Sequence, residues 1–91
     1  MIKYAATHPG RLGDALYSLP FLRYLYGCNG WEFDFLSSEY CLPLKELFEY
    51  QPFINSFQIS KDYVLDNWGC GGQPWYVPIP NEQQYNQTFQ L

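Results

Sequence analysis

The sequence predicts an α/β fold in which strand, helix, strand, helix and strand follow one another and form a short parallel sheet. Short apolar runs alternate with segments of helical periodicity, and turn residues separate these segments. Aromatic residues make up 21% of the 91 residues, which supplies large apolar side chains for a core. This order of elements is typical of parallel strands joined by helical crossovers.

The first strand and the first helix are predicted in the first third of the chain. The apolar run over residues 2–7 indicates a buried strand, and residues 8–10 are turn formers. Apolar residues then recur at helical spacing over residues 12–26, which predicts a helix. Pro20 is expected to kink this helix, and Gly27 is expected to end it.

A second strand, a second helix and a third strand follow. Aromatic and acidic residues alternate over residues 31–36, as in a strand with two unlike faces. Ser37 and Ser38 are candidate caps for a helix that ends before Pro52. The apolar run over residues 53–59 is the third strand candidate. Residues 1–60 therefore form the predicted βαβαβ unit.

Residues 61–91 are expected to be an irregular extension of the same domain, rich in aromatic residues, proline and glycine. Residues 81–91 contain several Gln and Asn with scattered apolar positions, which is compatible with a short helix. Trp68, Trp75 and Tyr76 could stack on a sugar ring, but covering the sheet is the favoured interpretation.

Composition excludes several classes of function. A formal charge of −4 without a basic cluster argues against nucleic acid as a partner. No apolar run is long enough to span a bilayer, and the first residues do not resemble a secretion signal. Three widely spaced cysteines suit reduced thiols in the cytoplasm. With a single histidine, we expect no metal site and no cofactor.

The loop between the first strand and the first helix is the candidate site. In an open parallel sheet, ligands bind where the carboxyl ends of strands meet the amino ends of helices. Gly10 and Gly13 would allow the backbone to approach a ligand, and Arg11 could bind a phosphate. Asp14 could act as a base or merely cap the helix, and His8 would lie at the strand end. The glycine pattern alone is a weak motif, because it is neither the dinucleotide fingerprint nor the P-loop.

Residues 8–25, which read HPGRLGDALYSLPFLRYL, resemble the first loop and helix of the heptosyltransferase-like glycosyltransferases. In that family a Gly-Asp pair opens a helix, as Gly13 and Asp14 would here. Residues 33–36 are similar to the family's second strand, and residues 53–57 to its short third strand. The likeness thus extends over about the first sixty residues.

The resemblance implies the N-terminal, acceptor-side part of an enzyme with two Rossmann-like, three-layer domains, the arrangement called GT-B. Asp14 would be the base that takes the proton of an acceptor hydroxyl, and His8, Gly10, Arg11 and Gly13 would bind substrate. The substrates implied are a nucleotide sugar and a glycan, commonly of the lipopolysaccharide core. Since the donor-binding domain would need many more residues, we expect a truncated transferase that is inactive alone.

Other interpretations of the same residues stay open. Arg11 could be an ordinary surface residue, and the His8-Pro9 pair departs from the small or polar residues usual in the family. Cys70 has no neighbour in sequence that would activate its thiol. The whole chain could instead be a non-catalytic α/β module for binding or dimerisation. A three-stranded sheet leaves an unpaired edge, through which a homodimer or a partner chain could bind.

Overall fold

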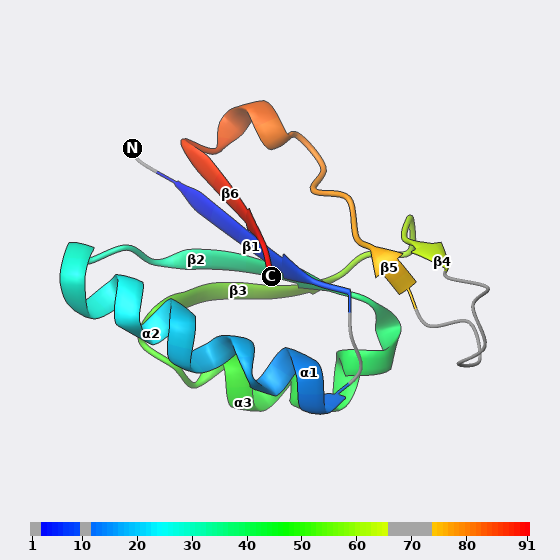
Figure 1. The fold of residues 1–91 in the computed structure, drawn as a ribbon, viewed down its shortest axis with the longest axis horizontal. Helices are drawn as coiled ribbons and strands as arrows, with labels where there is room; N and C mark the ends of the chain where they lie inside the picture. Colours follow the sequence, from blue (N-terminus) through cyan, green and yellow to red (C-terminus); the bar gives the residue numbers. More distant parts are fainter. Residues whose placement is uncertain (1–2, 10–11, 66–73) are drawn as a thin grey trace.

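The computed structural model describes residues 3–9, 12–65 and 74–91, and it confirms the α/β class. A four-stranded, all-parallel sheet has the order β3-β2-β1-β6, and α1, α2 and α3 lie together on one face (Figure 1). The elements are β1 (Tyr4–His8), α1 (Leu12–Leu16), α2 (Ser18–Asn29), β2 (Phe33–Ser37), η1 (Glu39–Leu44), α3 (Lys45–Glu49), β3 (Ile54–Ile59), β4 (Val64–Leu65), β5 (Pro74–Tyr76), η2 (Glu82–Gln84) and β6 (Gln87–Gln90).

The first crossover consists of two helices, because the expected single helix is interrupted at Tyr17. Pro20 explains the position of this break, since a proline ring clashes with the carbonyl four residues earlier, and α1 ends at Leu16. The prediction that Gly27 ends the helix is wrong. The helix continues to Asn29, and Gly30 adopts the left-handed conformation (φ 71°) and donates its N–H to the Tyr26 carbonyl.

The second crossover is also less regular than expected. It begins with the 3-10 helix η1, which contains Pro43, and continues directly into α3. Ser38 occupies the N-cap position of η1, but its side chain makes no capping hydrogen bond. The proposed capping role of Ser37 and Ser38 is therefore wrong, and both side chains are instead buried behind the end of β2.

Aromatic side chains form the centre of the core between the sheet and the helices. Phe35 of β2 stacks on Phe57 of β3, with 5.7 Å between ring centroids and 10° between planes. Phe48 of α3 packs against both rings at centroid distances of 4.6 and 5.1 Å. All three side chains are fully buried, so this cluster holds the second crossover against the sheet.

Within residues 81–91, the short helix that the sequence allows is limited to the 3-10 helix η2, and Gln87–Gln90 instead form the fourth strand of the sheet, β6. β6 pairs in parallel with β1, aligning Tyr4 with Gln87 and Thr7 with Gln90. Phe89 of β6 packs edge-on against Phe33 at 5.8 Å and against Phe21 at 6.4 Å. The sheet thus has four strands, β1 is paired on both sides, and the outer strands are β3 and β6.

The segment just before β6, which includes η2, lies on the face of the sheet opposite the helices (Figure 1). Residues 61–91 are not irregular throughout, because β4 and β5 pair as an antiparallel two-stranded sheet within the connection from β3 to β6. Val77 and Ile79, which follow β5, are buried. These residues therefore add a small apolar cluster beside the partly polar strands.

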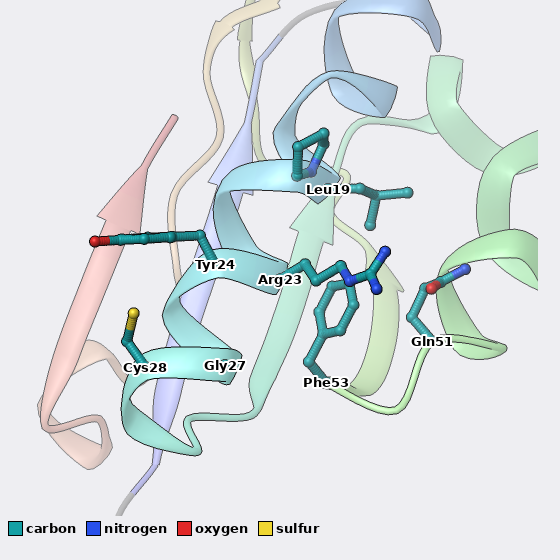
Figure 2. Close-up of a pocket in the computed structure, with 8 residues that line it drawn as sticks. Leu19, Arg23, Tyr24, Gly27, Cys28, Gln51 and Phe53 are labelled. Atoms are coloured by element: carbon teal, nitrogen blue, oxygen red, sulfur yellow. The ribbon is translucent and has the colours of Figure 1, made fainter.

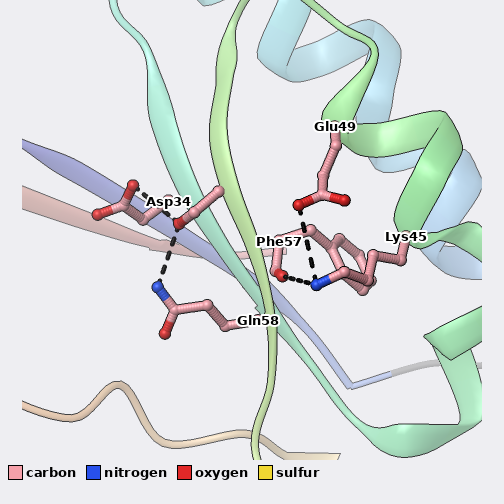
Figure 3. A network of polar contacts seen from close by, with 6 residues as sticks. Asp34, Lys45, Glu49, Phe57 and Gln58 are labelled. Carbon is pink, nitrogen blue, oxygen red and sulfur yellow. Dashed lines mark hydrogen bonds and ion pairs between the residues drawn. The ribbon is translucent and has the colours of Figure 1, made fainter.

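A polar network attaches this connection to the sheet. Asp34 points away from the core because its neighbour Phe35 points into it. The Asp34 carboxylate accepts hydrogen bonds from the Ser56 hydroxyl at 3.1 Å and from the Tyr85 hydroxyl at 3.0 Å. The Gln58 amide donates to the Ser56 hydroxyl at 3.1 Å (Figure 3). The network therefore links β2, β3 and the segment before β6.

Tyr85 is expected to make stability depend on pH in alkaline solution. Burial, followed by its hydrogen bond to Asp34 and the charge of Asp34, raises the Tyr85 pKa to about 12 from 10.0. A pKa raised on folding means that the contribution is complete below pH 10 and is lost as the pH rises towards 12. We expect Tyr85→Phe to cost about 1 kcal/mol at neutral pH and to flatten the fall in unfolding free energy over that interval.

Urea unfolding from pH 7 to pH 12 would measure this effect. Tyr50→Phe is the matched control, since the Tyr50 side chain is 87% exposed. A Tyr85→Phe curve that is parallel to the wild-type curve between pH 10 and 12 would exclude the link between Tyr85 and Asp34.

Candidate functional site

The candidate site lies at the carboxyl ends of β1 and β2. β1 ends at His8, and the short helix α1 that follows it carries Asp14. β2 ends at Ser37, and η1 then carries Cys41. α1 and η1 pack against each other, which brings the two loops together. The carboxyl end of β1 also borders β6. The chain leaves β1 through the helices on one face of the sheet, and the segment just before β6 lies on the other face (Figure 1). Ligands bind at such a switch point in open α/β sheets.

Asp14 is exposed, and its carboxylate lies near two other titratable side chains. Burial lowers the pKa of His8 and raises the pKa of Cys41, and the negative charge of Asp14 opposes the first change and adds to the second. A charge has such an effect only over a short distance in partly exposed surroundings. The predicted site residues His8 and Asp14 therefore lie within range of each other's charge, and the Asp14 side chain is exposed to solvent.

His8 is partly buried at the end of β1. Burial lowers its pKa below the ordinary value of 6.5, and the nearby charge of Asp14 offsets part of this decrease. The imidazole is thus mainly neutral at pH 7, and a neutral imidazole can donate one hydrogen bond and accept another. Its place beside Asp14 is suited to orienting a polar ligand group.

Three buried side chains lie behind this pair, and the sequence analysis did not assign them to the site. Burial raises the pKa of the Cys41 thiol, the hydroxyls of Ser37 and Ser38 offset part of the rise, and Asp14 adds to it. A raised pKa keeps Cys41 a thiol and makes it a poor nucleophile. Both serine hydroxyls lie near the sulfur, yet neither makes a hydrogen bond of ordinary geometry with another described residue. In the sequence, the feature that could have pointed to these residues is the pair Ser37 and Ser38, which directly follows the predicted strand over residues 31–36.

Gly13 lies in α1 and needs no special backbone conformation. A Cβ atom added at Gly13 would have no neighbour within 4 Å, so packing does not require glycine there. Gly13 directly precedes Asp14 in the sequence, and the open space at Gly13 would admit a ligand close to the backbone.

Several predicted residues fall outside the part of the chain that the structure describes. Gly10 and Arg11 of the candidate site belong to this group, as do Trp68 and Cys70. The Trp75 side chain is also not described, and Tyr76 is partly buried.

Metal ligands do not gather among the residues described: no group of three His, Cys, Asp or Glu side chains could hold an ion there. Within residues 3–9, 12–65 and 74–91, no helix has both the length and the apolar character needed to cross a membrane. Comparison of the chain with family models, with curated proteins and with solved structures gave no match.

Proposed function

We propose that this chain is the acceptor-side part of a heptosyltransferase-like glycosyltransferase, in which Asp14 is the general base. The observation that carries the proposal is the exposed Asp14 carboxylate beside His8, at the carboxyl edge of a parallel sheet. The likeness of residues 8–25 to that family supports the same role for Asp14.

The proposed reaction moves one sugar from a nucleotide sugar to a hydroxyl of a glycan or lipopolysaccharide core. Asp14 accepts the proton of the acceptor hydroxyl while its oxygen forms a bond to the anomeric carbon of the donor sugar. The bond from that carbon to the phosphate oxygen breaks, and the nucleotide leaves with the electron pair. Attack from the face opposite the leaving group inverts the anomeric centre.

His8 and Gly13 have supporting roles in this proposal. The neutral His8 imidazole would accept or donate a hydrogen bond to the acceptor sugar and so orient its hydroxyl towards Asp14. Gly13 would let the sugar approach the α1 backbone. Gly10 and Arg11 keep their predicted roles as substrate-binding residues, with Arg11 suited to a phosphate. The donor sugar would bind to a separate donor-binding domain.

Acceptor binding by the chain alone tests the proposal without any donor domain. We expect a heptose-containing core saccharide to shift the NMR signals of His8, Gly13 and Asp14 in a saturable way. Gly13→Ala should stabilise the fold by about 0.5–1 kcal/mol, because alanine favours the helix, and should weaken acceptor binding. No saturable shift, or shifts confined to residues remote from α1, would contradict an acceptor site here.

A non-catalytic module for dimerisation is the second candidate, and one observation favours it. Large apolar side chains are exposed on the helical layer: Leu16 is 42% exposed, Tyr17 82% and Tyr24 65%. Such a surface is typical of an interaction site when its residues are contiguous. A dimer in light scattering, combined with no response to saccharide, would favour this module over the transferase.

A further inference from the structure

A groove of about 510 Å³ runs along α2 and continues towards the segment before β3 (Figure 2). We call it the α2 groove, and its lining residues are Leu19, Pro20, Arg23, Tyr24, Gly27, Cys28, Gln51 and Phe53. Because Gln51 and Phe53 precede the first residue of β3, the groove extends to the amino ends of the strands. Asp14 lies at the opposite, carboxyl edge, so this groove is distinct from the proposed acceptor site.

Gly27 lines the groove, and no close contact or positive φ in the fold requires a glycine there. The residue lies inside α2, its φ is not in the left-handed region, and a Cβ atom added to it would have no neighbour within 4 Å. Glycine within a helix costs about 1 kcal/mol relative to alanine. The absence of a side chain at Gly27 leaves open space along this part of the helix surface.

Arg23 is the single charged residue among those that line the groove. Its side chain extends from α2 towards Gln51, close to the Phe53 ring (Figure 2). Arg23 makes no ion pair with any residue that the structure describes. The ion pair found among these residues joins Lys45 to Glu49. An unpaired guanidinium offers planar, parallel donors that match a carboxylate.

The remaining surface of the groove is mainly apolar. Leu19 and Pro20 contribute hydrocarbon surface, and the Phe53 ring, which is almost fully buried, borders the groove. The exposed Tyr24 ring points away from Arg23 (Figure 2). The nearby Cys28 side chain raises the pKa of Tyr24 above its ordinary value of 10.0, so the Tyr24 hydroxyl carries no charge at neutral pH. One cation on an otherwise neutral, apolar surface selects a ligand with one negative group and an apolar body.

We propose that the α2 groove binds a small carboxylic acid whose apolar body is an aromatic ring or a short alkyl chain. The carboxylate pairs with the Arg23 guanidinium, and the apolar body lies over Gly27 between Leu19 and Tyr24. A volume of about 510 Å³ is within the usual size range of small-molecule sites.

NMR titration with 3-phenylpropanoate tests this proposal, with 3-phenylpropan-1-ol as the uncharged counterpart. The acid should give saturable shifts at Arg23, Gly27 and Phe53, and the alcohol should bind about tenfold more weakly. Arg23→Gln should weaken binding of the acid to the level of the alcohol. Gly27→Leu should abolish binding of both probes by filling the hollow, while circular dichroism stays unchanged.

Lys61→Gln is the matched control for charge, since Lys61 is exposed and does not line the groove. Its affinity for the acid should equal that of the wild type. Equal affinity for the acid and the alcohol, an unchanged affinity in Arg23→Gln, or the absence of saturable shifts at Gly27 would each overturn the proposal. A failure here leaves the acceptor titration at Gly13 and Asp14 unaffected, because the two sets of signals are separate.

Discussion

Asp14→Asn is expected to slow sugar transfer about 100- to 10,000-fold, the usual contribution of a positioned general base. Asparagine keeps the size of the side chain but cannot accept the proton of the acceptor hydroxyl at neutral pH. The measurement is nucleotide release from a nucleotide sugar after the chain is mixed with a separately produced donor-binding domain and an acceptor. Without the added domain, we expect no release from either form.

Glu32→Gln is the control for this experiment, because Glu32 is an exposed acid that precedes β2 and lies away from α1. The rate with this variant should match that of the wild type. Affinity for the acceptor should change little in Asp14→Asn, since the lost interaction is made mainly during proton transfer. A wild-type rate in Asp14→Asn would exclude Asp14 as the base.

Phe35→Ala is expected to lower the free energy of unfolding by about 3–5 kcal/mol. Phe35 is fully buried between Phe57 and Phe48, so its removal leaves a cavity and ends two ring contacts. A small domain has about 5–15 kcal/mol of stability in total, so a large part of it would be lost. Urea unfolding followed by circular dichroism measures the change.

Tyr50→Ala provides the comparison, because Tyr50 is 87% exposed at the end of α3 and does not belong to the core. It should change the stability by less than about 0.5 kcal/mol. Equal effects of Phe35→Ala and Tyr50→Ala would mean that the aromatic cluster is not the centre of the core.

The βαβαβ order could be predicted from the sequence because each strand has a local signal. Residues 2–7, 31–36 and 53–59 are apolar or alternating runs bounded by turn residues, and β1, β2 and β3 lie within or next to them. A kink at Pro20 was predicted, whereas the structure has two helices separated at Tyr17. The steric effect of a proline falls on the carbonyl four residues before it, so the helix ends at Leu16.

β6 could not be predicted in the same way. Its sequence, Gln87–Gln90, contains one large apolar residue, Phe89, and two glutamines. What makes it a strand is pairing with β1 and contact of Phe89 with Phe33, and both involve residues more than fifty positions away. Strand formation in such segments depends on tertiary packing more than on intrinsic preference.

In the candidate site, too, some residues could be predicted from local sequence and others depend on tertiary packing. His8 and Asp14 could be predicted because they flank a strand end and a helix start, which lie at one edge of a parallel sheet. Cys41, Ser37 and Ser38 were missed because their burial behind that edge depends on how η1 packs against α1. Serine after a strand is equally typical of a helix cap, and sequence alone does not distinguish these roles.

NMR titration of His8 tests most directly whether Asp14 lies beside it at the mouth of the site. His8 is the single histidine of the chain, so its ring proton signals can be assigned without ambiguity. We expect a pKa below 6.5 in the wild type and a lower pKa in Asp14→Asn, because the nearby negative charge is lost. An unchanged His8 pKa in Asp14→Asn would contradict the proximity of the two side chains, on which the proposed function depends.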